Sequence, residues 1–184
     1  MIISYNPNSD LIADEELSAV SETDILEEFL SEEGHSFWVF VEDGTPELSH
    51  MESYLETWGV DFSYYESTAN NAKYRYMVQD SSQSLTSDGY TIYGEAVKSG
   101  HSAELLDGLD RKVVFKNATA MKAAQGFVSN GDGSFVKGAR TMYSLYQSGS
   151  NAVSWANGNP VSGEGAILMV MTEQKNSVGS SYVG

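Results

Sequence analysis

The chain has 184 residues and a net charge of −16, because 26 acidic residues stand against 10 basic ones. An apolar content of 41% and an aromatic content of 11% exclude a disordered chain and are typical of a single globular domain over residues 1–184. Seventeen acids lie in residues 1–66 and the first basic residue is Lys73, so phosphate would be repelled and nucleic acid is disfavoured as a partner. The absence of cysteine excludes disulfides, zinc–thiolate sites and a cysteine nucleophile.

The first part of the chain has the pattern of a strand, a helix and a second strand. Met1–Tyr5 and Phe37–Val41 are short apolar runs that each stop at a polar, turn-rich segment. Between them, Asp14–Glu33 has the apolar spacing of a helix, with Asp10 or Asp14 as its N-cap and Gly34 at its end. Such a βαβ unit makes the two strands parallel and brings the loops that follow them to one edge of the sheet.

Later segments predict one more helix and several short strands. Glu47–Thr57 has helical spacing, while Ala118–Ala124 fits either a strand or a helix. Strands are expected at four runs rich in aromatic and β-branched residues, which are Val60–Tyr65, Tyr74–Val78, Tyr90–Tyr93 and Arg111–Phe115.

The C-terminal third of the chain reads as a hairpin, a loop and a buried strand. Asn130-Gly131-Asp132-Gly133 predicts a turn between strands at Gly126–Ser129 and Ser134–Val136. Ser144–Asn151 is expected to be a loop, and Ala152–Ala156 a short helix or turn. The most apolar run, Ala166–Thr172, predicts a central strand, whereas Ser177–Gly184 is a Gly/Ser-rich tail. Because Met1 leads directly into a strand, we expect the domain to be excised from a longer protein.

The candidate site is the sheet edge after the first two strands, where open α/β sheets bind ligands. The residues expected to line a crevice there are Asn8, Asp10, Glu42, Asp43 and Thr45. The three carboxylates among them suit Mg²⁺ or Ca²⁺, or a pair acting as acid and base, so a metal-dependent hydrolase is one interpretation. Capping of the loops by the same carboxylates is the other interpretation.

No catalytic motif is complete. Val39–Thr45 resembles half of the signature of haloacid-dehalogenase-type phosphatases, but Val41 occupies the position of the nucleophilic carboxylate. His35, His50 and His101 have no metal-ligand spacing. Neither a glycine-rich phosphate loop nor a GxSxG elbow is present in the sequence. We therefore expect no enzymatic activity, no catalytic residue, no metal ligand and no cofactor.

Several short motifs occur in the order of a known family. They are Asn6–Leu11, Glu32-Glu33-Gly34, Leu48–Phe62, Gly100–Phe115 with Ser102 in place of the usual proline, Tyr143–Trp155 and Gly165–Thr172. In this order they resemble the extracytoplasmic domain of the auxiliary component of gliding-motility-type ABC transport systems. The resemblance implies a three-layer α/β sandwich with a mostly parallel central sheet, flavodoxin-like and similar to class I glutamine amidotransferases.

The same resemblance implies a setting and a role. The parent protein would be anchored in the membrane by segments outside this chain and would lie on the extracytoplasmic face of the bacterial cytoplasmic membrane. Its partners would be a membrane permease or other subunits of the transporter. We therefore expect a non-catalytic binding or interaction module that contacts a partner protein or ligand, with a structural spacer domain as the third interpretation beside the hydrolase.

Overall fold

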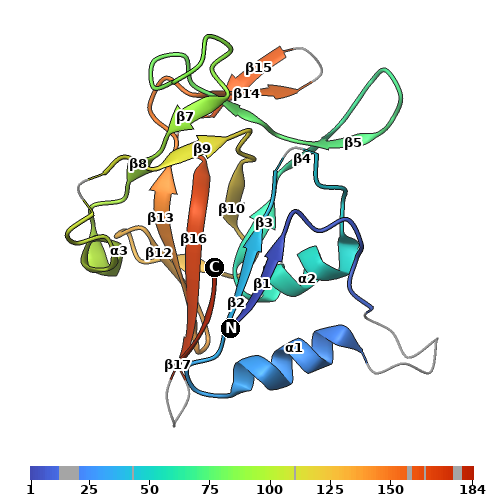
Figure 1. The fold of residues 1–184 in the computed structure, drawn as a ribbon, viewed down its shortest axis with the longest axis vertical. Coiled ribbons are helices and arrows are strands. Elements are labelled where there is room, and N and C mark those ends of the chain that lie inside the picture. Colours follow the sequence, from blue (N-terminus) through green and yellow to red (C-terminus); the bar gives the residue numbers. More distant parts are fainter. Residues whose placement is uncertain (13–20, 43, 110, 157–158, 164, 176–179) are drawn as a thin grey trace.

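A computed structural model describes residues 1–12, 21–42, 44–109, 111–156, 159–163, 165–175 and 180–184 (Figure 1). The helices of this part are α1 (Glu22–Ser31), α2 (Ser49–Thr57) and α3 (Gly100–Leu105). The strands are β1 (Ile2–Tyr5), β2 (Ser36–Phe40), β3 (Val60–Phe62), β4 (Tyr64–Glu66), β5 (Lys73–Arg75), β6 (Val78–Gln79), β7 (Thr91–Tyr93), β8 (Glu95–Ala96), β9 (Val114–Lys116), β10 (Met121–Ala123), β11 (Val128–Ser129), β12 (Ser134–Lys137), β13 (Arg140–Gln147), β14 (Val153–Ala156), β15 (Asn159–Ser162), β16 (Ile167–Lys175) and β17 (Ser180–Val183).

The main sheet is mixed, and most of its strand pairs are antiparallel. Its order in the described part of the chain is β1-β2-β17-β16-β13-β12-β11, with β10 pairing both β16 and β3, and β8 pairing β13. Only the β1–β2 and β2–β17 pairs are parallel. The predicted three-layer, mostly parallel, flavodoxin-like sandwich is therefore wrong: the fold is β-rich, and its antiparallel strands curl into half a barrel.

The βαβ unit at the start of the chain is confirmed as a local structure. β1 and β2 are adjacent and parallel, with Ile3 opposite Trp38 and Tyr5 opposite Phe40. The helix between them begins at Glu22, because the Ser21 hydroxyl accepts the Asp24 N–H at 3.3 Å and caps the first turn. Asp10 does not cap this helix, and Asp14 lies outside the described residues.

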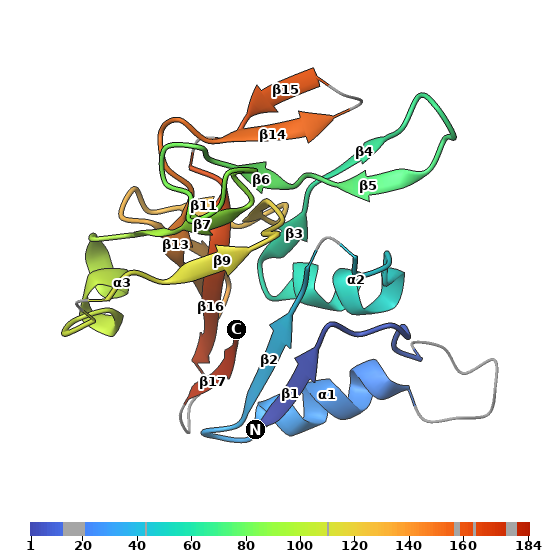
Figure 2. The same ribbon diagram turned by 45° about the horizontal axis from the view of Figure 1, so that its top comes forward.

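In the described residues, helices pack on one face of the β1–β2 pair and none packs on the other face. Both α1 and α2 pack on the face that carries Phe37, where they build one core with Leu30 and Trp58. On the opposite face Tyr5 is 76% exposed and Phe40 is 47% exposed. Within the described residues, the parallel part of the sheet thus has a helical layer on one side only, as Figures 1 and 2 show.

The two longest strands explain the most apolar run of the sequence. β13 and β16 pair along most of their length, and both of their faces are buried. Met142 and Ile167 face the helical core, whereas Tyr143 and Leu168 face a second core formed with Val78 and other residues. The strand predicted at Ala166–Thr172 is confirmed, and it is buried on both faces, which suits a nearly continuous apolar run.

Other expectations divide between correct and wrong. The hairpin around Gly131 is confirmed, since β11 and β12 pair across it, and Ala118–Ala124 contains a strand, β10. The loop predicted over Ser144–Asn151 is wrong at its start because β13 continues to Gln147, and the segment expected to be a short helix or turn contains strand β14 (Val153–Ala156). The Gly/Ser-rich tail contains β17, which lies between β2 and β16.

Candidate functional site

The two loops after β1 and β2 are neighbours in space, as predicted. The Asn6 side-chain amide nitrogen donates to Glu42 Oε1 at 2.6 Å, and the Thr45 hydroxyl donates to Asn6 Oδ1. The Glu42 backbone N–H in turn donates to Thr45 Oγ1 at 3.1 Å. These polar groups satisfy one another, so they brace the two loops together and present no open ligand set.

Asp10 is the N-terminal cap of α2. Its Oδ2 accepts the His50 backbone N–H at 2.9 Å and the Ser49 hydroxyl at 3.1 Å, while its Oδ1 accepts the backbone N–H groups of Met51 and Leu11 at 3.0 and 2.9 Å. Burial opposes ionisation of this carboxyl, but the hydrogen bonds from His50, Met51, Leu11 and Ser49 outweigh it and hold the pKa of Asp10 below its usual value. A carboxylate that is bonded in this way stabilises the helix terminus and is not free for catalysis.

The remaining members of the predicted crevice are Asn8 and Asp43. Asn8 is exposed, and its side-chain oxygen accepts the hydroxyl of the neighbouring Ser9 at 3.4 Å. Asp43 lies outside the described residues. In the part of the chain that the structure describes, no group of three or more histidine, aspartate or glutamate side chains could hold a metal ion.

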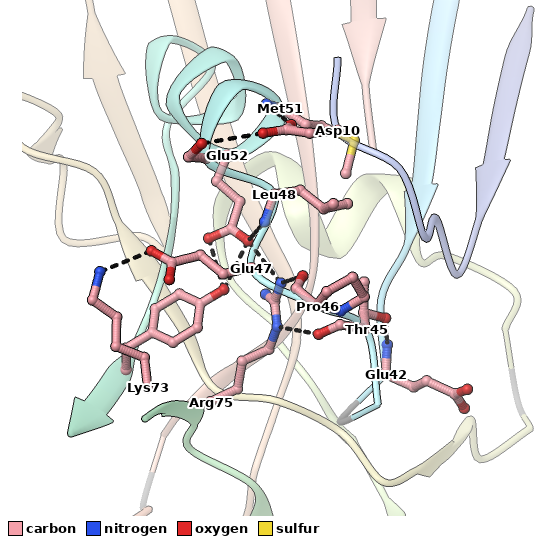
Figure 3. A network of polar contacts seen from close by, with 12 residues as sticks. Asp10, Glu42, Thr45, Pro46, Glu47, Leu48, Met51, Glu52, Lys73 and Arg75 are labelled. Carbon is pink, nitrogen blue, oxygen red and sulfur yellow. Dashed lines mark hydrogen bonds and ion pairs between the residues drawn. The ribbon is translucent and has the colours of Figure 1, made fainter. Parts of the chain in front are cut away.

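Sequence reasoning missed a buried ion pair beside this edge (Figure 3). Arg75 of β5 donates from Nη2 to Glu52 Oε1 of α2 at 2.7 Å and to the Pro46 carbonyl at 2.9 Å, and its guanidinium carbon lies 4.7 Å from the centre of the Phe62 ring. Glu52 also accepts the Tyr64 hydroxyl at 2.7 Å, and burial followed by this hydrogen bond raises the pKa of Tyr64. The pair ties the loop after β2 to α2 and β5.

One signal in the sequence could have pointed to this pair. Arg75 is the second lysine or arginine of the chain, after Lys73, and follows an acidic segment of 66 residues without either. It lies in a tyrosine-rich run that predicts a buried strand. A buried arginine requires a carboxylate partner. Which of the many acids supplies it depends on how α2 is placed against β5, and local patterns do not contain that information.

The fold has an apolar cleft between two diverging arms of the main sheet. One arm continues from β16 through β17 to β2 and β1, and the other from β16 through β10 to β3 (Figures 1 and 2). The cavity between them has a volume of about 190 Å³. It is lined mainly by apolar residues, which are Trp38–Val41, Leu55, Val60, Phe62, Phe115, Ala118, Met121, Leu168–Val170 and Val183.

Strand edges without a partner border this cleft. One edge of β16 pairs with β13. The other edge pairs with β17 along Thr172–Lys175 and with β10 at Ile167. Between these two contacts, no described strand pairs with that edge at Leu168–Met171. On the other side, β17 reaches β2 at Ser36 and Phe37, and the Val39 N–H donates to the Gly184 carbonyl at 2.7 Å. β17 therefore lies between the start of β2 and the C-terminal half of β16. No described strand lies between the rest of these two strands.

Comparisons with protein-family models, with curated proteins and with solved structures find no match for this chain. The flavodoxin-like fold implied by the resemblance to the ABC-transporter component is not the fold observed here. Among the helices of the described residues, none combines the length and the apolar character needed to cross a membrane.

Proposed function

We propose that this chain is a non-catalytic protein-interaction module that binds an extended apolar segment of a partner protein by strand addition. The observation that carries the proposal is a pair of strand edges without a partner among the described residues, Leu168–Met171 of β16 and the end of β2 beyond the Val39 N–H, which line the same apolar cleft. An added strand would satisfy backbone groups on both sides and bury its side chains against aromatic and aliphatic neighbours.

The register of β17 sets the direction of the incoming strand. Val183 lies opposite Phe37 in the parallel pair and opposite Thr172 in the antiparallel pair. A segment continuing this line would run parallel to β2 and antiparallel to β16. Its alternate residues would face either Leu55 and Phe62 on the helical side or Trp38 and Phe115 on the other, so apolar residues are favoured at both sets of positions.

Size and charge agree with a short apolar peptide as the occupant. An apolar cavity of ~150 Å³ accommodates a benzene-sized group, and the cleft volume of about 190 Å³ exceeds that. The net charge of −16 favours partners whose flanking residues are basic.

The partnership with an ABC transport system and the extracytoplasmic location stay predictions. A permease gene and an ATPase gene beside the gene for this protein would support them. Asp10 and Glu42 do not support the hydrolase interpretation, because Asp10 caps a helix and Glu42 accepts a hydrogen bond from Asn6.

The test uses one strand in two forms, Val-Thr-Val-Thr-Lys fused directly after Gly184 and the same peptide added free at millimolar concentration. We expect the fusion to raise the melting temperature and to protect the Val41 and Val170 amides from hydrogen exchange. We expect the free peptide to shift the NMR signals of the same residues. A fusion of Gly-Ser-Gly-Ser-Lys controls for added length.

Two variants test whether the added strand binds in the cleft. Val41→Asp puts a charge inside the apolar lining and should abolish both effects, whereas Val128→Asp places the same charge on β11, at the opposite edge of the sheet, and should leave them unchanged. If the Val41 and Val170 amides exchange equally fast in both fusions, or if the free peptide binds Val41→Asp as well as the unaltered protein, the proposal is wrong.

A further inference from the structure

A buried carboxylate far from the cleft has one oxygen without a partner. Asp80 follows β6 and is only 1% exposed. Its Oδ1 accepts the Ser82 N–H at 2.9 Å, the Ser82 hydroxyl at 2.6 Å and the Gln83 N–H at 3.2 Å. Its Oδ2 is buried and has no hydrogen-bond partner. An ionised oxygen in this state is strongly destabilising unless a counter-charge reaches it.

A second carboxylate points at the same place. A Cβ atom built on Gly149 would lie 2.8 Å from Asp80 Oδ2 and 3.0 Å from Glu95 Oε1, so both oxygens face one point next to that glycine. Gly149 does not have a positive φ, which means that the turn itself does not require glycine. A side chain at this position would collide with the two carboxylates, so glycine is what lets them approach one another here, with the Gln83 Cγ at 3.6 Å from the same Cβ position.

No protein cation neutralises this pair. Among the described residues, neither Asp80 nor Glu95 forms an ion pair with a basic side chain. Lys98 and Lys112 line the adjacent cavity together with Glu95, but the Lys112 ammonium lies 4.5 Å from the centre of the Tyr93 ring and forms no ion pair with the carboxylate. The negative charge therefore remains available to an added cation.

We propose that Asp80 Oδ2 and Glu95 Oε1 bind a divalent cation, and that this cation is Ca²⁺. Both available donors are carboxylate oxygens, which hard cations prefer, and the Gln83 side chain, whose Cγ lies at the same place, carries a further oxygen. These residues come from a loop and a two-residue strand, and Ca²⁺ accepts such irregular geometry more readily than Mg²⁺, which requires a near-ideal octahedron. The bound ion would fasten the segment after β6 to β8.

This site is independent of the proposed strand addition, because it shares no residue with the cleft. It also differs from the acidic edge expected from the sequence, where the carboxylates are already hydrogen-bonded. Asp80 and Glu95 are separated by fourteen intervening residues and form no known calcium-loop spacing, so the sequence alone did not indicate them.

The experiment is calorimetric titration of the apo protein with CaCl₂, in 150 mM NaCl so that weak binding to the acidic surface is screened. We expect one saturable equivalent of Ca²⁺, weaker binding of Mg²⁺ and a rise in melting temperature that EDTA reverses. Asp80→Asn keeps the Oδ1 turn and removes the charge, and Glu95→Gln changes an exposed residue. Each should weaken the binding of Ca²⁺ by roughly tenfold or more.

Two further variants separate this site from general charge effects. Asp132 forms the same Asp-x-Ser turn, with its Oδ1 accepting the Ser134 N–H at 3.0 Å and the Ser134 hydroxyl at 2.6 Å, so Asp132→Asn is the matched control and should bind Ca²⁺ normally. Gly149→Ala would place a methyl group 2.8 Å from Asp80 Oδ2 and 3.0 Å from Glu95 Oε1, which forces the two carboxylates apart and should prevent binding. Absence of saturable Ca²⁺ binding, or equal binding by Glu95→Gln and the unaltered protein, would overturn the proposal; Glu95→Gln decides even if Asp80→Asn does not fold.

Discussion

Arg75 Nη2 and Glu52 Oε1 lie 2.7 Å apart in a buried ion pair that joins β5 to α2. The side chains of both residues are largely removed from water. Glu52 also accepts the Tyr64 hydroxyl, and Arg75 also donates to two backbone carbonyls. One atom, Arg75 Nη1, is buried without a partner. The pair therefore specifies how the loop after β2 meets the helix, and it is sensitive to the loss of either member.

Removing one partner of this pair should destabilise the protein strongly. We expect Glu52→Gln to lower the free energy of unfolding by about 3–5 kcal/mol, because it leaves the guanidinium charge buried and uncompensated. Urea unfolding followed by circular dichroism measures the change. The exposed pair of Lys73 and Glu47 is the control: Lys73→Ala should change stability far less, because water and salt screen this pair. Equal losses for both variants would contradict the assignment of a buried, structural role.

The cap that Asp10 places on α2 should show in the pH dependence of stability. Replacement by asparagine should cost roughly 1 kcal/mol at neutral pH, a typical value for the loss of a helix cap. Because the hydrogen bonds to Asp10 hold its folded pKa below the usual value for aspartate, its contribution is fully present above that usual value and is lost as the pH falls through the folded pKa.

Unfolding of the unaltered protein and Asp10→Asn should therefore differ by a constant amount from neutral pH down to about pH 5 and converge at lower pH. Asn8→Ala changes an exposed neighbour and should have an effect within about 0.5 kcal/mol at every pH. A difference that grows on acidification would show that the folded pKa of Asp10 is raised instead of lowered.

The acidic part of the chain should respond to ionic strength. Residues 1–66 hold 17 acids and no base, and much of this charge is exposed. Salt shortens the range of their repulsion, to about 10 Å at 0.1 M. We expect the melting temperature to rise when NaCl is increased from low to moderate concentration in the presence of EDTA. A flat or falling trend would mean that these acids are already neutralised by partners.

No turnover of generic ester, phosphate or amide substrates is expected, with or without Mg²⁺. Val41 occupies the position of the phosphatase nucleophile, and all four hydrogen bonds to the Asp10 carboxylate come from its own structural partners. A colorimetric assay on nitrophenyl substrates tests this. Activity that disappears in Asp43→Asn or Asp10→Asn would restore the hydrolase interpretation.

Local patterns of the sequence determined the parts of the fold that depend on short-range interactions. The alternation of apolar runs with an acidic helix predicted β1 and β2 as a parallel pair and correctly brought their loops together. Turn residues around Gly131 predicted the hairpin of β11 and β12, and the apolar run from Ala166 predicted the buried strand β16. In each case the residues that encode the element also lie within it or directly beside it.

Only the tertiary structure decided the sheet order and the use of the polar side chains. β17 comes from a Gly/Ser-rich tail, yet it occupies a central position because β2 and β16 offer it backbone partners on both sides. The sequence allowed Asp10 to cap the first helix, to bind a metal or to cap its loop, whereas in the structure it caps α2, an outcome that depends on where the Ser49 turn lies in space. Strand pairing and the satisfaction of buried polar groups join residues far apart in the chain, so no local pattern can specify them.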